Sequence, residues 1–351
     1  VPGGSYWSPR QSVIDLSGSG RTFVQFRDEV VCQKACEFLR GEAHKRDKKP
    51  FAAVVGFYNP HPPYVGPKEL FDYYYTRVDV PDEDHSLLPD YLQDYYSKYR
   101  DWERPNPIDE ESKRRALAAY YANTEHVDAR LGEILRTLDS SGLRDNTLVI
   151  YCSDHGDGLG RRGLWGKGSF YDDSVRVPMI ARLPGIVPAG RRTDHNVNLR
   201  DVGSTCIDIA DARGLAASDA ASFLPLLEGR ATEAPNTTES EIVQGPTPFG
   251  LDGQVAYKMF CDGPWKMWTY HIDGKAHFSL FNRADDPLER HDRVAEDALR
   301  DRVASMKTRL LSGWDPEAEI RAAKRRRADR RELDEVWFKD WHHAGYEVRE
   351  D

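Results

Sequence analysis

The chain has 351 residues, of which 39% are hydrophobic and 30% charged, and its formal net charge at pH 7 is −9. This length is enough for one large domain and a smaller one, and the composition is typical of a soluble globular protein. No run of about eighteen apolar residues is present, which argues against a membrane-spanning helix. The acidic balance argues against nucleic acid as a partner.

The cysteines follow no regular spacing, so we predict no disulfide framework. Cys152 and Cys206 lie in apolar runs and are expected to be buried thiols. No signal-peptide pattern is visible at the start of the chain, so we expect a reducing, cytoplasmic location. The chain begins Val1-Pro2 without methionine, which we interpret as a cut end.

The first third of the chain shows two helical patterns, one buried-strand pattern and one long loop. Apolar residues at helical spacing predict a helix over residues 28–40, with Asp28 as its cap, and a second helix over residues 111–139. The apolar run PFAAVVGFY, residues 50–58, predicts a buried strand. Residues 65–110 are rich in Pro, Asp and Tyr and predict a loop, either one wall of a substrate pocket or simple surface cover.

His61 follows the predicted strand 50–58 directly and is surrounded by prolines in the segment PHPPY. Proline fixes φ, so the backbone around this histidine is restrained. The alternative is an ordinary loop histidine in contact with water.

The segment 147–184 combines two strand patterns with a cluster of polar residues. The apolar run 148–151 predicts a buried strand of a parallel sheet, and residues 176–180 predict the next strand. Asp154 and His155 come at the end of the first strand, where ligands bind in open α/β sheets. Carboxylate and imidazole are both metal ligands, and Lys167 adds a cation in a glycine-rich loop. Alternatively, Asp154 and His155 only cap a turn.

The last third of the chain predicts a helix over residues 201–212 and then a small antiparallel sheet. Its four strands are expected at residues 240–243, 254–259, 265–270 and 276–281, followed by a helix over residues 296–311. The tail from Trp314 is strongly charged. Its basic run KRRRADRR, residues 324–331, indicates a solvated helix face or, alternatively, a contact to another subunit or an anionic polymer.

Three segments together resemble the sulfatase family, within the alkaline-phosphatase-like superfamily. They are PHPPY at residues 60–64, the helix, turn and strand around residues 128–147, and SDHGDGLGRRGLWGKGSFYDDSVRVPMI at residues 153–180. The resemblance is strongest to the choline-sulfatase and iduronate-sulfatase-like branches. It implies an α/β fold with a mostly parallel sheet flanked by helices over residues 1–230. A smaller C-terminal antiparallel sheet with a helix follows over residues 231–313, and a charged helical tail over residues 314–351.

The resemblance also implies an activity, the hydrolysis of a sulfate ester on a small molecule or a sugar. In this family a Cys or Ser converted to formylglycine attacks sulfur, and one divalent cation, Ca²⁺ or alternatively Mg²⁺, binds the sulfate and the nucleophile. Asp154 and His155 match metal ligands, and His61 and Lys167 match the catalytic groups that contact sulfate. The tail resembles one that packs against neighbouring subunits, so a homo-oligomer is a further expectation.

Three family motifs have no counterpart in this sequence. They are the Asp-Asp pair at the end of the first strand that completes the metal site, the Cys-x-Pro-x-Arg segment that supplies formylglycine, and the Lys-x-His-Leu-Gly segment. We therefore expect the chain to lack the N-terminal part of a sulfatase and to be incomplete and inactive alone. The alternatives are a phosphonate or phosphate ester hydrolase of the same superfamily, or a non-catalytic binding or assembly protein on a sulfatase scaffold.

Overall fold

The computed structural model describes residues 14–45, 49–81, 84–99, 108–212, 219–230, 235–244, 255–326 and 328–329. The chain divides into two compact units that interleave along the sequence. The first unit comprises Val1–Ser86, Arg104–Arg192 and Leu224–Thr232, and the second unit comprises Leu87–Glu103, Thr193–Phe223 and Glu233–Asp351. In these described ranges, no helix has both the length and the apolar character that a bilayer crossing requires. The domain boundaries at residues 230 and 313 and the cytoplasmic location stay predictions.

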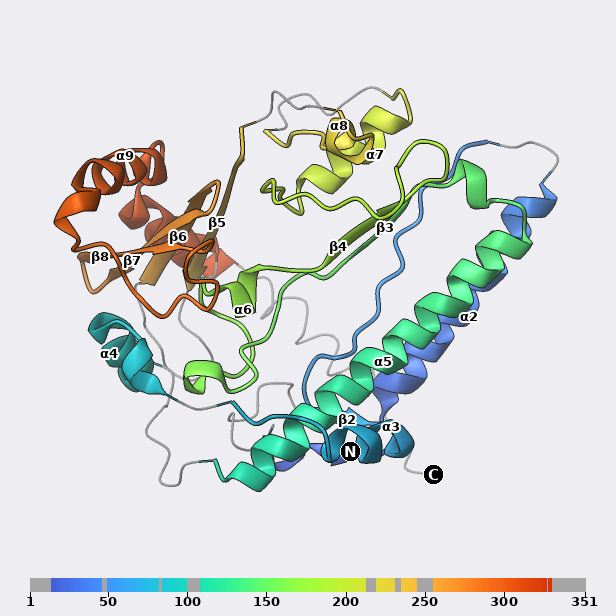
Figure 1. The fold of residues 1–351 in the computed structure, drawn as a ribbon, viewed down its shortest axis with the longest axis horizontal. Coiled ribbons are helices and arrows are strands. Elements are labelled where there is room, and N and C mark those ends of the chain that lie inside the picture. The colour runs from blue at the N-terminus through green and yellow to red at the C-terminus, as the bar shows by residue number, and fades with distance from the viewer. Residues whose placement is uncertain are drawn as a thin grey trace. The chain divides into compact units, whose positions relative to one another are not determined.

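Two long helices, α2 (Phe23–His44) and α5 (Glu110–Ser140), lie side by side in the first unit (Figure 1). Both predicted helices are confirmed, but α2 begins earlier than expected. Thr22 and Gln25 form a capping box there, each side chain bonding the backbone N–H of the other residue. The prediction that Asp28 caps the helix is wrong, because Asp28 lies inside α2 and is fully buried.

The core of the first unit forms where α5 meets two very short parallel strands, β1 (Gly18–Ser19) and β2 (Val65–Gly66). A Cβ at Gly66 would lie 2.6 Å from the Ala122 side chain, so the close approach of β2 to α5 requires glycine. The small side chains of α5 make this approach possible. The buried cluster comprises Ile14, Tyr64, Val78, Ala116, Leu117, Ala118, Ala119 and Trp165.

The second pair of strands in the first unit is β3 (Val149–Cys152) with β4 (Met179–Arg182). Both strands lie close to where the sequence predicted them, but they pair antiparallel, with Val149 opposite Arg182, and β3 is only half-buried. The expectation of a buried parallel strand is therefore wrong for β3. An apolar run indicates that a strand favours the interior of a sheet. It does not show which other strand pairs with it, or in which direction.

Residues 51–58 have no assigned strand, so the strand predicted there is wrong. In the view of Figure 1 this extended segment runs between α5 and the β3–β4 pair. Among the described residues, no backbone hydrogen bond joins residues 51–57 to another segment. The side chain of Val54 is fully exposed. The segment has the composition of a strand but pairs with no strand in the described part of the chain, and the hydrogen-bonded ladder is what defines a strand.

The second unit contains an antiparallel sheet of four strands in sequential order, as predicted. The strands are β5 (Thr237–Gln244), β6 (Val255–Asp262), β7 (Trp265–Ile272) and β8 (Lys275–Asn282). After the turn η4 (Asp297–Leu299), helix α9 (Arg300–Leu311) packs on β6 and β7. Their shared core consists of Phe260, Met267, Leu280, Val303, Met306 and Leu310.

The long loop predicted over residues 65–110 is instead largely helical. It contains α3 (Lys68–Tyr75) in the first unit, then the turn η1 (His85–Leu87), and α4 (Asp90–Tyr99) in the second unit. Tyr95 and Tyr96 of α4 are buried, and the Tyr95 ring lies 6.0 Å from that of Tyr270 on β7. These tyrosines therefore belong to the core of the second unit, so the pocket-wall interpretation is wrong for them.

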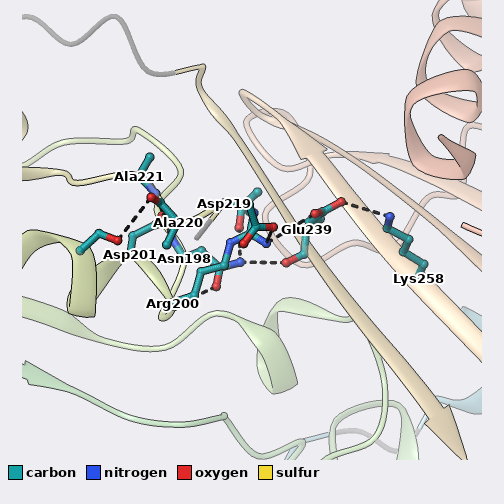
Figure 2. A network of polar contacts seen from close by, with 10 residues as sticks. Asn198, Arg200, Asp201, Asp219, Ala220, Ala221, Glu239 and Lys258 are labelled. Atoms are coloured by element: carbon teal, nitrogen blue, oxygen red, sulfur yellow. Dashed lines mark hydrogen bonds and ion pairs between the residues drawn. The ribbon is translucent and has the colours of Figure 1, made fainter. Parts of the chain in front are cut away.

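A polar network ties the segment around α7 (Asp201–Ile209) to the antiparallel sheet of the second unit (Figure 2). Arg200 lies 2.9 Å from an Asp219 oxygen and 3.6 Å from an Oε atom of Glu239 on β5. The other Glu239 oxygen lies 3.2 Å from Lys258 Nζ on β6. Asn198 adds a hydrogen bond to the Glu239 carbonyl. The alternating charges join this connecting segment to strands β5 and β6.

All five cysteines are free thiols, which agrees with the absence of a disulfide framework. The expectation that Cys152 and Cys206 are buried is wrong, because both are exposed. Residues 316–326 of the charged tail are helical, whereas the tail beyond residue 329 and its expected subunit contact lie outside the described residues. The helix α8 (Leu224–Leu227) belongs to the first unit.

Candidate active site

The loop that follows β3 is shaped by glycines at positions of close backbone approach. Gly156 N–H donates to the Ser174 carbonyl, and Gly158 N–H donates to the Gly166 carbonyl, both at 2.8 Å. A Cβ at Gly156 would lie 2.1 Å from the carbonyl oxygen of Asp173, next to Ser174 in α6 (Asp172–Val175). The loop can therefore close on α6 only with glycine at this position.

Asp157, which the sequence analysis did not single out, organises this loop. Its Oδ1 accepts the backbone N–H groups of Leu159 and Gly166 at 3.0 and 2.8 Å, and its Oδ2 accepts the Tyr64 hydroxyl at 2.7 Å. The carboxylate thus joins the loop after β3 to the PHPPY segment. The sequence DHGDG offers a sign of this role, because an Asp between two glycines readily accepts hydrogen bonds from nearby backbone N–H groups.

Arg162 is a second structural residue that the sequence did not reveal. It lies in the turn η3 (Arg161–Gly163) with a positive φ of 54°, and its side chain is buried. Its guanidinium contacts Asp173 at 2.9 Å and stacks over the Tyr171 ring at 4.0 Å. This ion pair fixes the glycine-rich loop against α6.

His155 and Lys167, which lie at opposite ends of this loop, are brought into direct contact. The Lys167 ammonium donates to His155 Nε2 at 2.6 Å, and His155 Nδ1 lies 2.8 Å from the Gly156 carbonyl. A hydrogen on Nδ1 satisfies that carbonyl and leaves Nε2 to accept the hydrogen bond from Lys167. Asp154 Oδ2 lies 3.5 Å from the same Nε2, and the Asp154 side chain is 83% exposed.

His61 is half-buried and belongs to the same group of basic side chains. Its Nδ1 contacts the Pro62 carbonyl at 2.7 Å, and its ring lies 4.8 Å from that of Tyr58. Burial is the main cause that lowers the pKa of His61 below its ordinary value, and the nearby charge of Lys167 lowers it further. His61 therefore lies within electrostatic range of the contacting pair His155 and Lys167, although it comes from a segment far away in sequence, and the exposed Asp154 lies beside His155.

Two basic groups in contact, with a third within electrostatic range, suit an anion whose charge is spread over several oxygens. A metal centre is less well supported. No three His, Cys, Asp or Glu side chains of the described ranges gather at metal-binding distance. Asp154 and His155 offer two donors, and Lys167 already occupies His155 Nε2. Because Ca²⁺ takes about six to eight oxygen ligands, these residues do not fit a complete calcium site.

Two family models match the chain. The sulfatase model matches residues 6–212, and the model of the C-terminal region of N-sulphoglucosamine sulphohydrolase matches residues 160–314. The choline-sulfatase of Rhizobium meliloti (strain 1021) is 30% identical over 84% of this chain and 57% of the relative. The arylsulfatase of Clostridium perfringens (strain 13 / Type A) is 28% identical over 80% of this chain and 56% of the relative. The chain thus spans a little over half the length of these curated relatives.

Solved structures share the fold. A 2-O GAG sulfatase aligns with a TM-score of 0.64 and 22% identity, over 84% of this chain and 64% of the other. The phosphonate monoester hydrolase of Agrobacterium radiobacter aligns with a TM-score of 0.65 and 22% identity, over 82% of this chain and 60% of the other. These alignments confirm the predicted fold class, an α/β unit followed by a smaller antiparallel sheet with a helix.

Proposed function

The chain belongs to the sulfatase family, and on that basis we propose that its first unit carries the anion-binding part of a sulfuric ester hydrolase site. The observation that carries the proposal is the contact of Lys167 Nζ with His155 Nε2 at 2.6 Å. His61 lies close enough to this pair for its pKa to be affected. The ligand that these groups suit is the tetrahedral sulfate group of a small-molecule or sugar sulfate ester.

Each basic residue has a distinct part in this proposal. Lys167 gives a permanent positive charge that attracts the sulfate oxygens. His155 orients the Lys167 ammonium through Nε2 and is itself held by the Gly156 carbonyl. His61 is neutral before the anion binds, because burial disfavours its charged form. An incoming sulfate favours the protonated imidazole, which can then donate to a sulfate oxygen or to the leaving oxygen.

The divalent cation and the formylglycine that the family resemblance implies remain part of the proposal. Asp154 is the residue of this chain that would hold a cation, because its carboxylate faces outward beside the basic group. When bound, such a cation would neutralise charge on the sulfate group. His155 is the second metal ligand that the resemblance implies, but no group of three or more His, Cys, Asp or Glu side chains in the described part of the chain completes a site. The sequence also lacks the Cys-x-Pro-x-Arg segment that would supply formylglycine.

Two other functions fit parts of the observations. The phosphonate monoester hydrolase of similar fold favours the first, since Lys and His side chains bind phosphorus and sulfur oxyanions alike. The second is a binding protein that takes the anion without turnover. Calorimetric titration with sodium sulfate, sodium phosphate and phenylphosphonate compares the affinities for the two kinds of anion, and hydrolysis of 4-nitrophenyl sulfate measures turnover. A preference for sulfate supports the main proposal, and a preference for phosphonate supports the first alternative. Turnover of the sulfate ester excludes the second alternative, whereas binding without turnover is expected of the anion-binding part alone as well as of a binding protein.

Replacement of Lys167 by Gln tests whether the Lys167 ammonium, in contact with His155, binds sulfate. We expect the affinity of the chain for inorganic sulfate to fall about 10- to 100-fold, because a charge-assisted hydrogen bond contributes about 1.5–3 kcal/mol. Titration calorimetry at constant ionic strength measures this change. The matched control is Lys68→Gln, which removes a lysine of the same unit that is paired with Asp72 on the surface of α3. Equal losses in both variants would show that Lys167 acts only through net charge.

Sulfate affinity should also depend on pH through His61. The pKa of His61 is below its ordinary value in the free chain, and bound sulfate raises it, so binding is coupled to proton uptake. Affinity therefore increases as the pH falls through the pKa of the bound state, and it levels off below the pKa of the free state. The slope is at most about tenfold per pH unit for one proton. His61→Gln should flatten the profile, and an unchanged slope in that variant would exclude His61 as the linked group.

A further inference from the structure

One turn of α2 holds both ends of the loop that carries His61. On one side of the loop, Asp28 Oδ1 accepts the Tyr58 N–H at 2.8 Å, and its Oδ2 accepts the backbone N–H and the side-chain amide of Asn59 at 3.0 and 2.7 Å. On the other side, Gln25 Nε2 donates to the Val65 carbonyl at 2.7 Å. The loop between these contacts contains His61 and its flanking prolines.

The Asp28 carboxylate is fully removed from water, and Asn59 is also buried. An ionised carboxylate in such a place is strongly destabilising unless donors satisfy its oxygens. Here three N–H groups do so, and all three come from the two residues Tyr58 and Asn59. The Asp28 carboxylate is therefore satisfied by the Tyr58–Asn59 segment and not by donors of its own helix.

That piece of backbone is coupled directly to His61. The His61 N–H donates to the Tyr58 carbonyl at 3.2 Å, which closes a tight turn. The Tyr58 and His61 rings lie 4.8 Å apart, so the imidazole packs on the residue that Asp28 holds. A shift of Tyr58 and Asn59 would move the imidazole relative to Lys167 and His155.

We propose that Asp28 is a positioning residue of the candidate site, which acts through the Tyr58–Asn59 backbone to hold the His61 imidazole beside Lys167 and His155. This assignment rests on the proposed function only in that His61 is taken to contact the anion. Gln25 supports the same loop from its other end. The role is distinct from a general contribution to the packing of α2 on α5, which other buried residues of α2 provide.

The test uses Asp28→Asn in the full chain, observed by NMR with labelled histidine, tyrosine and lysine. Each oxygen of Asp28 faces at least one N–H donor. In Asp28→Asn, one of the two oxygens is replaced by an NH₂ group. Whichever way the carboxamide is turned, this NH₂ group faces an N–H donor of Tyr58 or Asn59, so at least one hydrogen bond to the loop is lost. The matched control is Glu29→Gln, which makes the same charge change on the same helix, at a residue paired with Arg21 near the surface.

In Asp28→Asn we expect loss of the magnetisation transfer between the Tyr58 and His61 rings, and loss of the sulfate-induced shift of His61. The shift of Lys167 with sulfate should remain, and Glu29→Gln should behave like the unchanged chain. If both His61 signals persist in Asp28→Asn, or if all sulfate responses fall together with thermal stability, the positioning role is wrong. Should Asp28→Asn fail to fold, Asn59→Ala removes one of the three hydrogen bonds and must weaken the ring-to-ring transfer.

The two proposals fail separately in this experiment. If the unchanged chain shows no response to sulfate at His61 or Lys167, the proposed anion-binding function is wrong. The ring-to-ring transfer in Asp28→Asn still decides the role of Asp28, because it needs no bound anion.

Discussion

Replacement of Gly156 by Ala should destabilise the first unit by about 3 kcal/mol, the upper part of the range for overpacked positions, and should abolish its response to sulfate. The added Cβ would lie 2.1 Å from the Asp173 carbonyl oxygen, so the loop and α6 must separate. That movement breaks the hydrogen bond from Gly156 to Ser174 and displaces the adjacent His155. Urea unfolding and calorimetric titration with sulfate measure the two effects.

The control for this substitution is Gly41→Ala in α2 of the same unit. Gly41 is helical, and apart from its chain neighbours and the nearby backbone of α2, no atom lies within 4 Å of a Cβ built there. Alanine there should leave sulfate binding unchanged and stabilise the helix by up to ~1 kcal/mol. A Gly156→Ala chain as stable as the unchanged protein would mean that the loop after β3 does not pack on α6 in solution.

Replacement of Lys266 by Met should destabilise the second unit by about 3–5 kcal/mol, because it removes the cation that neutralises a buried carboxylate. The side chains of Lys266 and Glu289 form an ion pair and are 0% and 1% exposed. Chemical unfolding observed at the tryptophans of the sheet measures the loss. Substitution of both residues, Lys266→Met with Glu289→Leu, should recover most of the stability, since no buried charge then remains.

A surface pair of the same unit provides the comparison. Arg300 and Asp297 lie 2.7 Å apart but are 78% and 91% exposed, so Arg300→Gln should leave unfolding unchanged within error. If Lys266→Met were equally neutral, the buried ion pair with Glu289 would not contribute to the stability of the second unit.

The sequence predicted the long helices and the antiparallel sheet because their side chains repeat with the period of the element. The helical spacing of apolar residues in α2 shows which face of the helix Asp28 occupies, but not which residues pack against that face. Likewise, the apolar composition around Val54 predicts a strand, but a strand also needs a hydrogen-bonded partner that composition does not identify. The tyrosines of α4 were assigned to a loop because their contacts are with β7, far away in sequence.

Those residues of the candidate site that belong to a recognisable sequence motif could be predicted individually. His61, Asp154, His155 and Lys167 were all named from the sequence, and the structure adds the contact between His155 and Lys167. Asp157 and Arg162 were not named, because each acts by fixing backbone and loop geometry that the motif does not encode. Asp28 was assigned a local capping role, whereas its hydrogen-bond partners lie about thirty residues further along the chain.

The interleaving of the two units has a consequence for synthesis on the ribosome. Helix α4 emerges between α3 and α5 of the first unit, yet Tyr95 and Tyr96 are buried only in the second unit, where β7 is made much later. At about 5–20 residues per second, these side chains wait on the order of ten seconds before their partner strand exists. Residues 224–232 likewise join the first unit only after part of the second has been translated. Neither unit can be completed before most of the chain has left the exit tunnel, and no single truncation point separates one unit from all segments of the other.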